Sequence, residues 1–320
     1  AGGLGVREAW GRRRSRTTAT PRGGGLGLLL AALPVLAWAW LVRTPQLGVT
    51  QAAILLLGLL LLILVGWMDD HRDLSQWPRL MAHLVAAAGL VWVVLGGVGD
   101  WPLTWWLLAA TGLLLATVWS INAHNFMDGI DALLGMQMVF VFAALAMLAG
   151  RLDAPGVMLG CAGLAATSAG FLYYNRPPAR IFMGDVGSVP LGWLVVVMAG
   201  LLWRRTPAGG WPARSLGSAF IGDASVTLLR RVWLGRRWYT AHREHAYQWL
   251  VRSGLSHGRV VLWYLAWNLL LAAPVAWLAV VQPHLGPLLL AVILLLGVLV
   301  HARIRAHCLA NRDRRRRGVA

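Results

Sequence analysis

The stretch ILLLGLLLLILVGWMDDHRD, residues 54–73, joins a long apolar run to two adjacent carboxylates, Asp69 and Asp70. A helix needs about 20 apolar residues to cross roughly 30 Å of hydrocarbon. The run is continuous rather than alternating, which favours a membrane helix over a strand of a membrane barrel. It therefore predicts a transmembrane helix with an acidic pair at its polar end.

Apolar runs of this length recur along all 320 residues. Hydrophobic residues make up 58% of the chain, and the mean hydropathy of +0.63 exceeds that of a soluble domain of this length. We predict an all-α polytopic integral membrane protein with about 10 transmembrane helices and an active site formed by cytoplasmic loops. The predicted spans are 24–43, 47–66, 80–98, 103–121, 132–150, 156–174, 186–203, 213–229, 260–280 and 284–300.

The net charge of +17 comes from Arg, which gathers in the connections between spans. All but five of the 29 basic side chains lie on the side that we assign as inside, following the positive-inside rule. This distribution accounts for the basicity without a nucleic-acid partner. We predict a basic cytoplasmic segment at 1–23, a transmembrane catalytic domain at 24–300 and a basic cytoplasmic tail at 301–320. Because residues 1–23 begin with Ala and lack an apolar core, we expect a truncated or misassigned start.

Four polar motifs follow the second, fourth, sixth and eighth predicted spans, so counting the spans places all four inside. The first contains Asp69 and Asp70, which can bind a divalent cation or share a proton. Helix capping in a solvated loop is the structural alternative. One-sided polar loops are typical of an enzyme with cytoplasmic substrates, whereas a transporter more often carries charges at the midplane of its spans.

The second motif is NAHNFMDGIDALLG, residues 122–135. Its amides and carboxylates recur at every third residue, which predicts that much of the set shares one helix face. Such a face suits a hydroxyl-rich or metal-bound ligand, and a polar turn at Gly129 is the alternative. The four residues are Asn122, Asn125, Asp128 and Asp131.

The third motif, RIFMGDVGSVPLGW at 180–193, places Asp185 between two glycines just before an apolar span. Glycines allow a ligand to approach the backbone closely, and helix-start amides favour anions. The alternative is a helix N-cap supplied by Asp185 or Ser188.

The fourth motif is AHREHAYQWLVRSGLSHGR, residues 241–259. His242, Arg243 and His245 fit phosphate binding better than zinc, because two His at this spacing lack a third ligand. A basic juxtamembrane helix is the alternative. Asp223 lies inside the eighth predicted span, either as a functional group or as the partner of Arg230 or of a helix start.

Together, GWMDD, NFMDGIDALLG, FMGDVGS and HREHAYQ, in this order, resemble the polyprenyl-phosphate N-acetylhexosamine-1-phosphate transferases. The resemblance runs from TPRGGG at 20–25 to about residue 265 and extends to the related phospho-N-acetylmuramoyl-pentapeptide transferases. It implies transfer of a sugar-1-phosphate from a UDP-N-acetylhexosamine to undecaprenyl phosphate, with release of UMP. It also implies Mg²⁺, with Mn²⁺ as the alternative, a bacterial inner-membrane location with a cytoplasmic active site, and a homodimer as one option.

The resemblance also implies roles for individual residues. Asp185 matches the magnesium ligand, and Asp69 and Asp70 match an essential pair, of which Asp69 would deprotonate or orient the lipid phosphate. Both direct displacement and a covalent phospho-enzyme are compatible with the pattern, and we favour direct attack. The nucleotide-sugar and diphosphate contacts would come from Asn122, Asn125, Asp128, Asp131, His242, Arg243 and His245.

Two departures from the family pattern affect the interpretation. HREHAYQ replaces the three-histidine run of the peptidoglycan branch, which favours the branch that initiates O-antigen, capsule or teichoic-type polymers. Family members also carry one more span before TPRGGG, and residues 1–16 cannot form it. Two other classes remain as alternatives: a transporter with carboxylate ion sites, and a CDP-alcohol phosphotransferase, whose acidic residues would recur within one motif.

Overall fold

The structure, a computed structural model, describes residues 20–43, 47–96, 99, 101–206, 209–236 and 242–316. Residues 1–19 of the predicted N-terminal segment and the last four residues of the predicted tail lie outside this part of the chain. The chain forms two compact units, Ala1–Gly210 and Trp211–Ala320, and each is described by itself.

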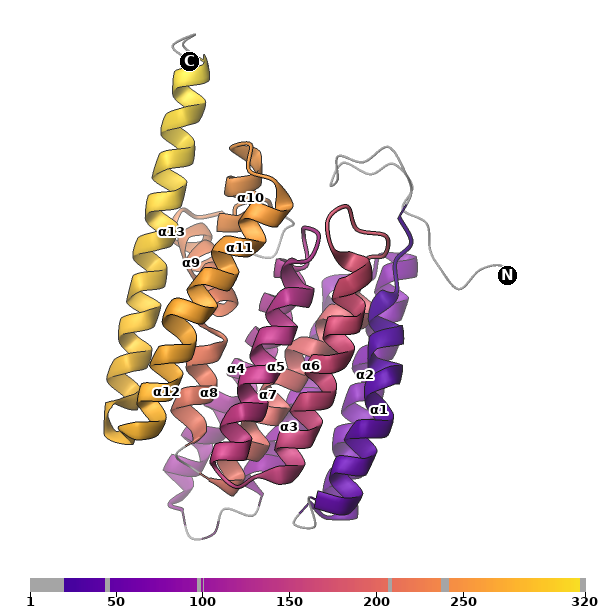
Figure 1. Cartoon of the computed structure of the whole chain (residues 1–320). Helices are drawn as coiled ribbons and strands as arrows, with labels where there is room; N and C mark the ends of the chain where they lie inside the picture. The colour runs from indigo at the N-terminus through magenta and orange to yellow at the C-terminus, as the bar shows by residue number, and fades with distance from the viewer. Residues whose placement is uncertain are drawn as a thin grey trace. The chain divides into compact units, whose positions relative to one another are not determined.

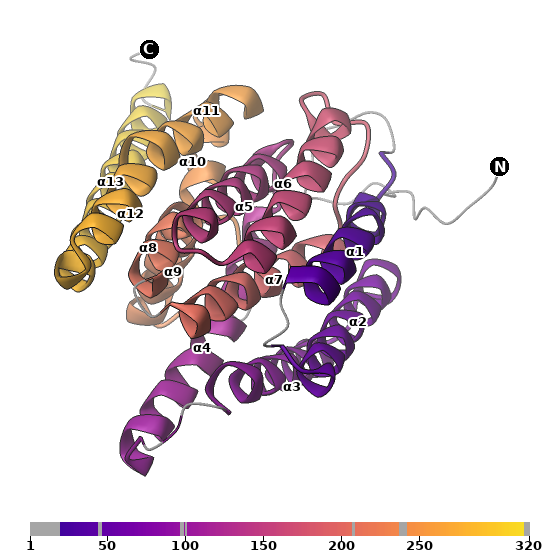
Figure 2. The ribbon, with the colours of Figure 1, turned by 60° about the horizontal axis from the view of Figure 1, so that its bottom comes forward.

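The first unit is a bundle of long apolar helices (Figure 1). α5 and α6 lie side by side in both ribbon views (Figure 1 and Figure 2). The helices are α1 (Gly24–Arg43), α2 (Val49–Arg72), α3 (Gln76–Leu95), α4 (Leu103–Met127), α5 (Leu133–Arg151), α6 (Pro155–Asn175) and α7 (Asp185–Arg205).

The helix α7 is the centre of this unit. It contacts each of the other six helices and is the most buried of the candidate spans. Trp193, fully buried on α7, donates its indole N–H to the carbonyl of Ala86 on α3 at 3.3 Å. The position of α7 therefore fixes the positions of its neighbours.

The second unit contains shorter and interrupted helices. Its helices are α8 (Gly210–Leu216), α9 (Ser218–Trp233), α10 (Ala246–Arg252), α11 (His257–Trp267), α12 (Ala273–Val281) and α13 (Gly286–Arg316). A π-helical turn at Asn268–Ala272 joins α11 to α12. Pro274 is the second residue of α12, one residue beyond this turn. Proline has no backbone N–H, so the wider turn accommodates the missing hydrogen bond and α11 and α12 continue as one apolar segment.

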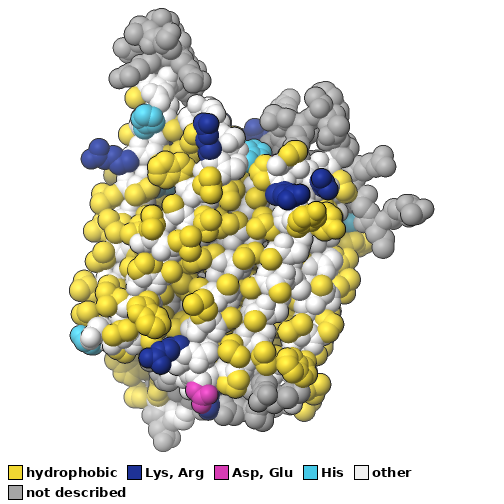
Figure 3. Space-filling model, in the orientation of Figure 1, with side chains coloured by type: hydrophobic (Ala, Val, Ile, Leu, Met, Phe, Trp, Pro, Cys, Tyr) yellow, Lys and Arg dark blue, Asp and Glu magenta, His cyan; other side chains and the backbone are white. Residues whose placement is uncertain are grey.

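Nine helical segments among the described residues are long and apolar enough to cross a membrane, which confirms the all-α polytopic class. The face drawn in Figure 3 is covered mainly by hydrophobic and uncharged side chains, as expected for contact with lipid. The predicted span 213–229 is the exception, because Gly217 separates α8 from α9 and neither is long enough alone.

The predicted tail continues the last span without a break. α13 runs for 31 residues through the region that we separated at residue 301. Residues 298–316 contain neither Gly nor Pro, so nothing in this stretch interrupts the helical hydrogen bonds.

The backbones of α1 and α7 approach each other closely at two glycines. A methyl group added to Gly25 would overlap the backbone of Gly187. Small residues at such crossings let membrane helices approach closely and gain van der Waals contact. Gly27, two residues further along α1, has no atom within 4 Å of the same added group.

We therefore expect Gly25→Ala to destabilise the protein by about 1–3 kcal/mol through overpacking. Gly27→Ala is the matched control, since it adds the same methyl group to the same helix in open space and removes a glycine from a helix interior. Thermal unfolding in detergent would measure both variants. Equal melting temperatures for the two would contradict the close α1–α7 contact.

Candidate active site

The first unit places Asp70 at the start of α7. Its Oδ1 accepts the backbone N–H of Asp185 at 3.1 Å, and its Oδ2 accepts that of Val186 at 3.0 Å. The first amides of a helix have no partner within the helix, and the helix dipole favours an anion there. Asp70 therefore caps α7 from the end of α2 and joins the two motifs.

Glycines make room for this contact. Gly184, with φ +76°, precedes α7, and an added Cβ would lie 2.5 Å from Oδ2 of Asp70. A Cβ on Gly66 of α2 would lie 2.5 Å from the carbonyl oxygen of Asp185. These two positions admit no side chain without moving the α2–α7 contact.

Asp69 and Asp185 both lie within 4.0 Å of one guanidinium nitrogen. Oδ2 of Asp69 accepts from Nη1 of Arg79 at 2.7 Å, and the same nitrogen is 3.9 Å from Oδ2 of Asp185. Oδ1 of Asp69 accepts the N–H of Leu74 at 2.7 Å. The two carboxyl groups are also close enough to hydrogen-bond to each other. Two carboxylates therefore share one cationic side chain at this site.

The end of α4 brings the predicted residue Asn125 to the same region. Asn125 donates to Oγ of Ser188 at 3.0 Å and also contacts the carboxyl group of Asp185. Asn122 donates to the carbonyl of Val118 at 2.7 Å, one turn earlier on α4. Asn125 is thus next to Asp185.

The prediction that much of this motif shares one helix face fails for its two carboxylates, because only Asn122 and Asn125 lie on the helix. α4 ends at Met127, and Asp128 is its C-cap with φ −81° and ψ 49°. Gly129 and Ala132, the latter with φ +67°, continue a turn in which Asp131 lies. A three-residue spacing alone could not distinguish this turn from continued helix.

Asp131 is 3% exposed, and its Oδ2 accepts the N–H of Ala179 at 3.1 Å. Asn175, at the end of α6, reinforces this link by accepting from Ala132 and donating to Ile181, both at 2.8 Å. The turn after α4 is therefore tied to the loop that leads to Asp185. Our sequence analysis overlooked Asn175, although an amide at the end of an apolar span was a signal for it.

The TPRGGG segment lies beside this loop. Phe182 donates its N–H to the carbonyl of Pro21 at 2.9 Å and accepts from Gly24 at 3.0 Å. Arg22 interacts electrostatically with Asp70. Arg22 was not among the predicted site residues, and its position two residues before α1 gave no periodic signal.

The carboxylates fit a magnesium ion that also binds substrate. In the part of the chain that the structure describes, no three His, Cys, Asp or Glu side chains are grouped as a metal cage. Mg²⁺ does not require one, since it usually binds one or two carboxylates, water and substrate phosphate. Asp69 and Asp185, with side chains 9% and 29% exposed, supply hard oxygen ligands of the kind that Mg²⁺ prefers.

The second unit holds the HREHAYQ motif, and its three predicted ligands differ in exposure. Arg243 is exposed, His242 is half-buried and His245 is 3% exposed. His245 is the N-cap of α10, and its Nδ1 is 3.7 Å from Oδ1 of Asp223. The structure therefore places His245 inside the unit, whereas Arg243 is open to a solvent-borne ligand.

Burial lowers the pKa of His242 to about 4, with further lowering by His245 and Arg231. His242 is therefore neutral at pH 7 and adds no positive charge to the motif. Arg243 remains the cationic candidate for phosphate contact.

Comparisons with known proteins agree with the motifs. Residues 52–202 match the model of glycosyl transferase family 4. The chain is 33% identical over 246 residues to the phospho-N-acetylmuramoyl-pentapeptide-transferase of Heliobacterium modesticaldum, covering 71% of this chain and 73% of that protein. The chain belongs to glycosyl transferase family 4.

Two further relatives show how broad the match to glycosyl transferase family 4 is. The chain is 31% identical over 221 residues to the phospho-N-acetylmuramoyl-pentapeptide-transferase of Lactiplantibacillus plantarum, covering 62% of this chain and 66% of that protein. It is 29% identical over 302 residues to the decaprenyl-phosphate N-acetylglucosaminephosphotransferase of Mycobacterium tuberculosis, covering 81% and 72%. The predicted family is confirmed, and the relatives' names describe two different sugars.

The state of His242 in this family 4 protein can be tested directly. We expect a pKa of about 4 in the folded protein, against about 6.5 in an unfolded chain. Protonation then favours unfolding, so this group's contribution to stability is present above pH 6.5 and is lost as the pH falls toward 4. NMR titration of labelled His, assigned with His242→Gln, would measure it. A midpoint near 6.5 would contradict the burial of the ring.

Proposed function

We propose that this chain transfers an N-acetylhexosamine-1-phosphate from a UDP-sugar to a polyprenyl phosphate and releases UMP. The observation that carries this proposal is the Asp69–Arg79–Asp185 arrangement beside Asn125, in a family 4 protein. The positive-inside distribution supports a cytoplasmic site in the inner membrane, where the nucleotide sugar is available. Undecaprenyl phosphate is the acceptor that we propose.

The reaction requires two anionic phosphates to meet. An oxygen of the lipid phosphate attacks the β-phosphorus of the UDP-sugar, a new P–O bond forms, and the bond to the bridging oxygen breaks. UMP leaves with that oxygen and its electron pair. We favour this single displacement because the lipid phosphate is already a competent nucleophile and needs no covalent enzyme intermediate.

The residues would act mainly by positioning and by electrostatics. A bound Mg²⁺ would neutralise charge on the diphosphate, with Asp185 as its main ligand and Asp69 as the second. Arg79 would hold the Asp69 carboxyl group in place for contact with the lipid phosphate. Asn125 would orient Asp185, and Asn122 and Asp128 would contact the nucleotide sugar.

Other predicted residues would act less directly. Asp70 would contribute by holding the start of α7, on which Asp185 lies. Asp131 would stabilise the loop before Asp185 rather than contact substrate. Arg243 would bind phosphate in the second unit, with His242 as a neutral hydrogen-bonding neighbour.

Two sugar donors have support. The sequence HREHAYQ favours a simple UDP-N-acetylhexosamine and the initiation of a surface polymer such as O-antigen. The 33% identity to a phospho-N-acetylmuramoyl-pentapeptide-transferase favours UDP-N-acetylmuramoyl-pentapeptide as the second candidate. An assay of UMP release with undecaprenyl phosphate, Mg²⁺ and each donor separates them. Release that needs the lipid and stops with EDTA supports the proposal, and no release from any donor by folded protein would overturn it.

The role of Asp185 gives a sharper test within the same assay. We expect Asp185→Asn to lower turnover by roughly 10³-fold or more, because an amide is a poor ligand for Mg²⁺ and removes a charge worth several kcal/mol in the transition state. The backbone N–H that Asp70 accepts stays in place, so the fold should be kept.

Asp153→Asn is the control for this substitution. Asp153 is exposed in the turn between α5 and α6, with φ +52°, a conformation that Asn tolerates. Its turnover should equal that of the unsubstituted protein. Normal activity of Asp185→Asn at saturating Mg²⁺ would remove the metal assignment while leaving the reaction class open to the UMP assay.

A further inference from the structure

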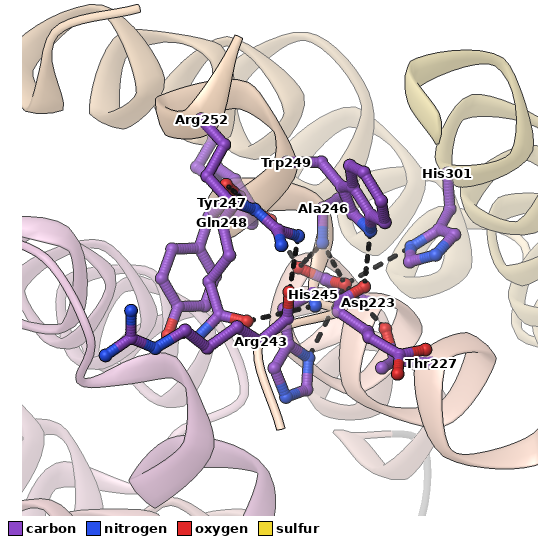
Figure 4. Close-up of polar contacts among 12 residues, drawn as sticks. Asp223, Thr227, Arg243, His245, Ala246, Tyr247, Gln248, Trp249, Arg252 and His301 are labelled. Carbon is purple, nitrogen blue, oxygen red and sulfur yellow. Dashed lines mark hydrogen bonds and ion pairs between the residues drawn. The ribbon is translucent and has the colours of Figure 1, made fainter. Parts of the chain in front are cut away.

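Asp223 of α9 lies inside the second unit, next to residues of α10, α11 and α13 (Figure 4). Its two carboxylate oxygens accept the N–H of Ala246 at 2.9 and 3.1 Å. Tyr264 of α11 donates its hydroxyl to Oδ2 at 2.6 Å, and Nδ1 of His301 on α13 is 3.2 Å from Oδ1. Thr227, one turn along α9, donates to Oδ1 at 3.3 Å.

This arrangement stabilises a short helix that would not persist alone. Isolated helices shorter than about 12 residues are marginal in water, and α10 has only 7. Asp223 supplies its N-terminal cap from another helix, and Gln248 adds a second link by accepting the N–H of His245 at 3.2 Å. A buried carboxylate is costly unless it is fully hydrogen-bonded, and here its hydrogen bonds include the first N–H of α10. Hydrogen bonds to a charged acceptor are stronger than those to a neutral one, so removing the charge would loosen the start of α10.

Glu244 holds the other side of the motif. Its Oε1 accepts from Arg231 at 2.7 Å and from Arg236 at 2.9 Å, and Arg230 lies 3.9 Å from its Oε2. Burial opposes ionisation of Glu244, but Arg236 and Arg231 outweigh it and keep its pKa below the ordinary value. Glu244 is therefore ionised and is fixed to the end of α9.

The backbone between these contacts is also restrained. Trp249 donates its indole N–H to the carbonyl of Glu244 at 3.1 Å. Arg252 donates to the carbonyl of Arg243 and stacks over the ring of Trp249 at 4.1 Å. Each of these contacts uses the main chain or a neighbouring side chain, and the Arg243 side chain remains exposed.

We propose that Asp223 and Glu244 are positioning residues that hold residues 242–246 so that the Arg243 guanidinium binds a phosphate group. The inference rests on the proposed function and adds which groups orient its phosphate ligand. Asp223 fixes the backbone at Ala246, and Glu244 is itself fixed by its ion pairs with the arginines at the end of α9. The two carboxylates therefore set the direction of the backbone next to Arg243. Neither carboxylate would touch the substrate.

The test is a double-mutant cycle on equilibrium binding of UMP and on the KM for the UDP-sugar. Arg243→Gln should weaken both by about 10–100-fold, the usual effect of losing a hydrogen bond from a charged group. Asp223→Asn should weaken both by about 10-fold and speed hydrogen exchange at the amides of Ala246 and Gln248. The variant with both Asp223→Asn and Arg243→Gln should bind no more weakly than Arg243→Gln alone, because the guanidinium that Asp223 helps to orient is then absent.

A purely structural role for Asp223 would give a different pattern. The hydrogen-exchange rates would rise, but the losses of binding free energy from the two substitutions would be additive, or Asp223→Asn would leave binding unchanged. Either result would overturn the inference. If Asp223→Asn does not fold, Glu244→Gln carries the same cycle, because its carboxylate is partly exposed and lies at the end of α9. Asp153→Asn is again the control and should match the unsubstituted protein in exchange and binding.

The outcomes also separate this inference from the proposed function. Folded, unsubstituted protein that neither binds UMP nor releases it from any UDP-sugar would overturn both. Binding and release by the unsubstituted protein, with independent effects of Asp223 and Arg243, would overturn the positioning role alone. Non-additive loss of binding with faster exchange at α10 supports both.

Discussion

The first unit depends on the hydrogen bonds that fix the end of α2 to the start of α7. Asp70 accepts the N–H groups of Asp185 and Val186. The first N–H groups of a helix have no acceptor within the helix, and water is scarce near lipid. Since Asp69 adjoins Asp70 and Asp185 carries one of these amides, the same contact brings two more carboxylates together. The site thus follows from the need to hydrogen-bond the free N–H groups at the start of α7 near lipid. Gly66 and Gly184 leave the space that this contact needs.

The two adjacent aspartates consequently differ in what they can do. Both oxygens of Asp70 are directed at backbone amides, whereas Asp69 faces Arg79 and the carboxyl group of Asp185. The two carboxyl groups and the Arg79 guanidinium lie beside a low-dielectric region, where electrostatic interactions are stronger than in water. Carboxyl oxygens of this kind are the ligands that the proposed Mg²⁺ would use.

The sequence predicted the features that depend on local composition. Continuous apolar runs gave the spans, and the family followed from four motifs in order. It did not show that Gly217 divides the eighth predicted span, because α8 and α9 together have the same composition as one helix. The three-residue spacing after Asn122 suggested one face, but the turn that begins at Asp128 redirects Asp131 into the loop before α7. The partners of Asp223 could not be inferred either, since Tyr264 lies 41 residues away and only packing brings them together.

The same physical device occurs in both units. A carboxylate on one helix caps the start of another, Asp70 for α7 and Asp223 for α10, and the capped helix lies next to an exposed or partly exposed candidate ligand. Backbone amides stabilise the ionised carboxylate, and the carboxylate in turn orders the loop that a bundle of apolar helices could not hold by packing. In a chain with 12 acidic residues, a carboxylate near the membrane surface is therefore as informative about the start of the next helix as about chemistry. The two uses can be told apart by asking whether both oxygens are directed at main-chain N–H groups.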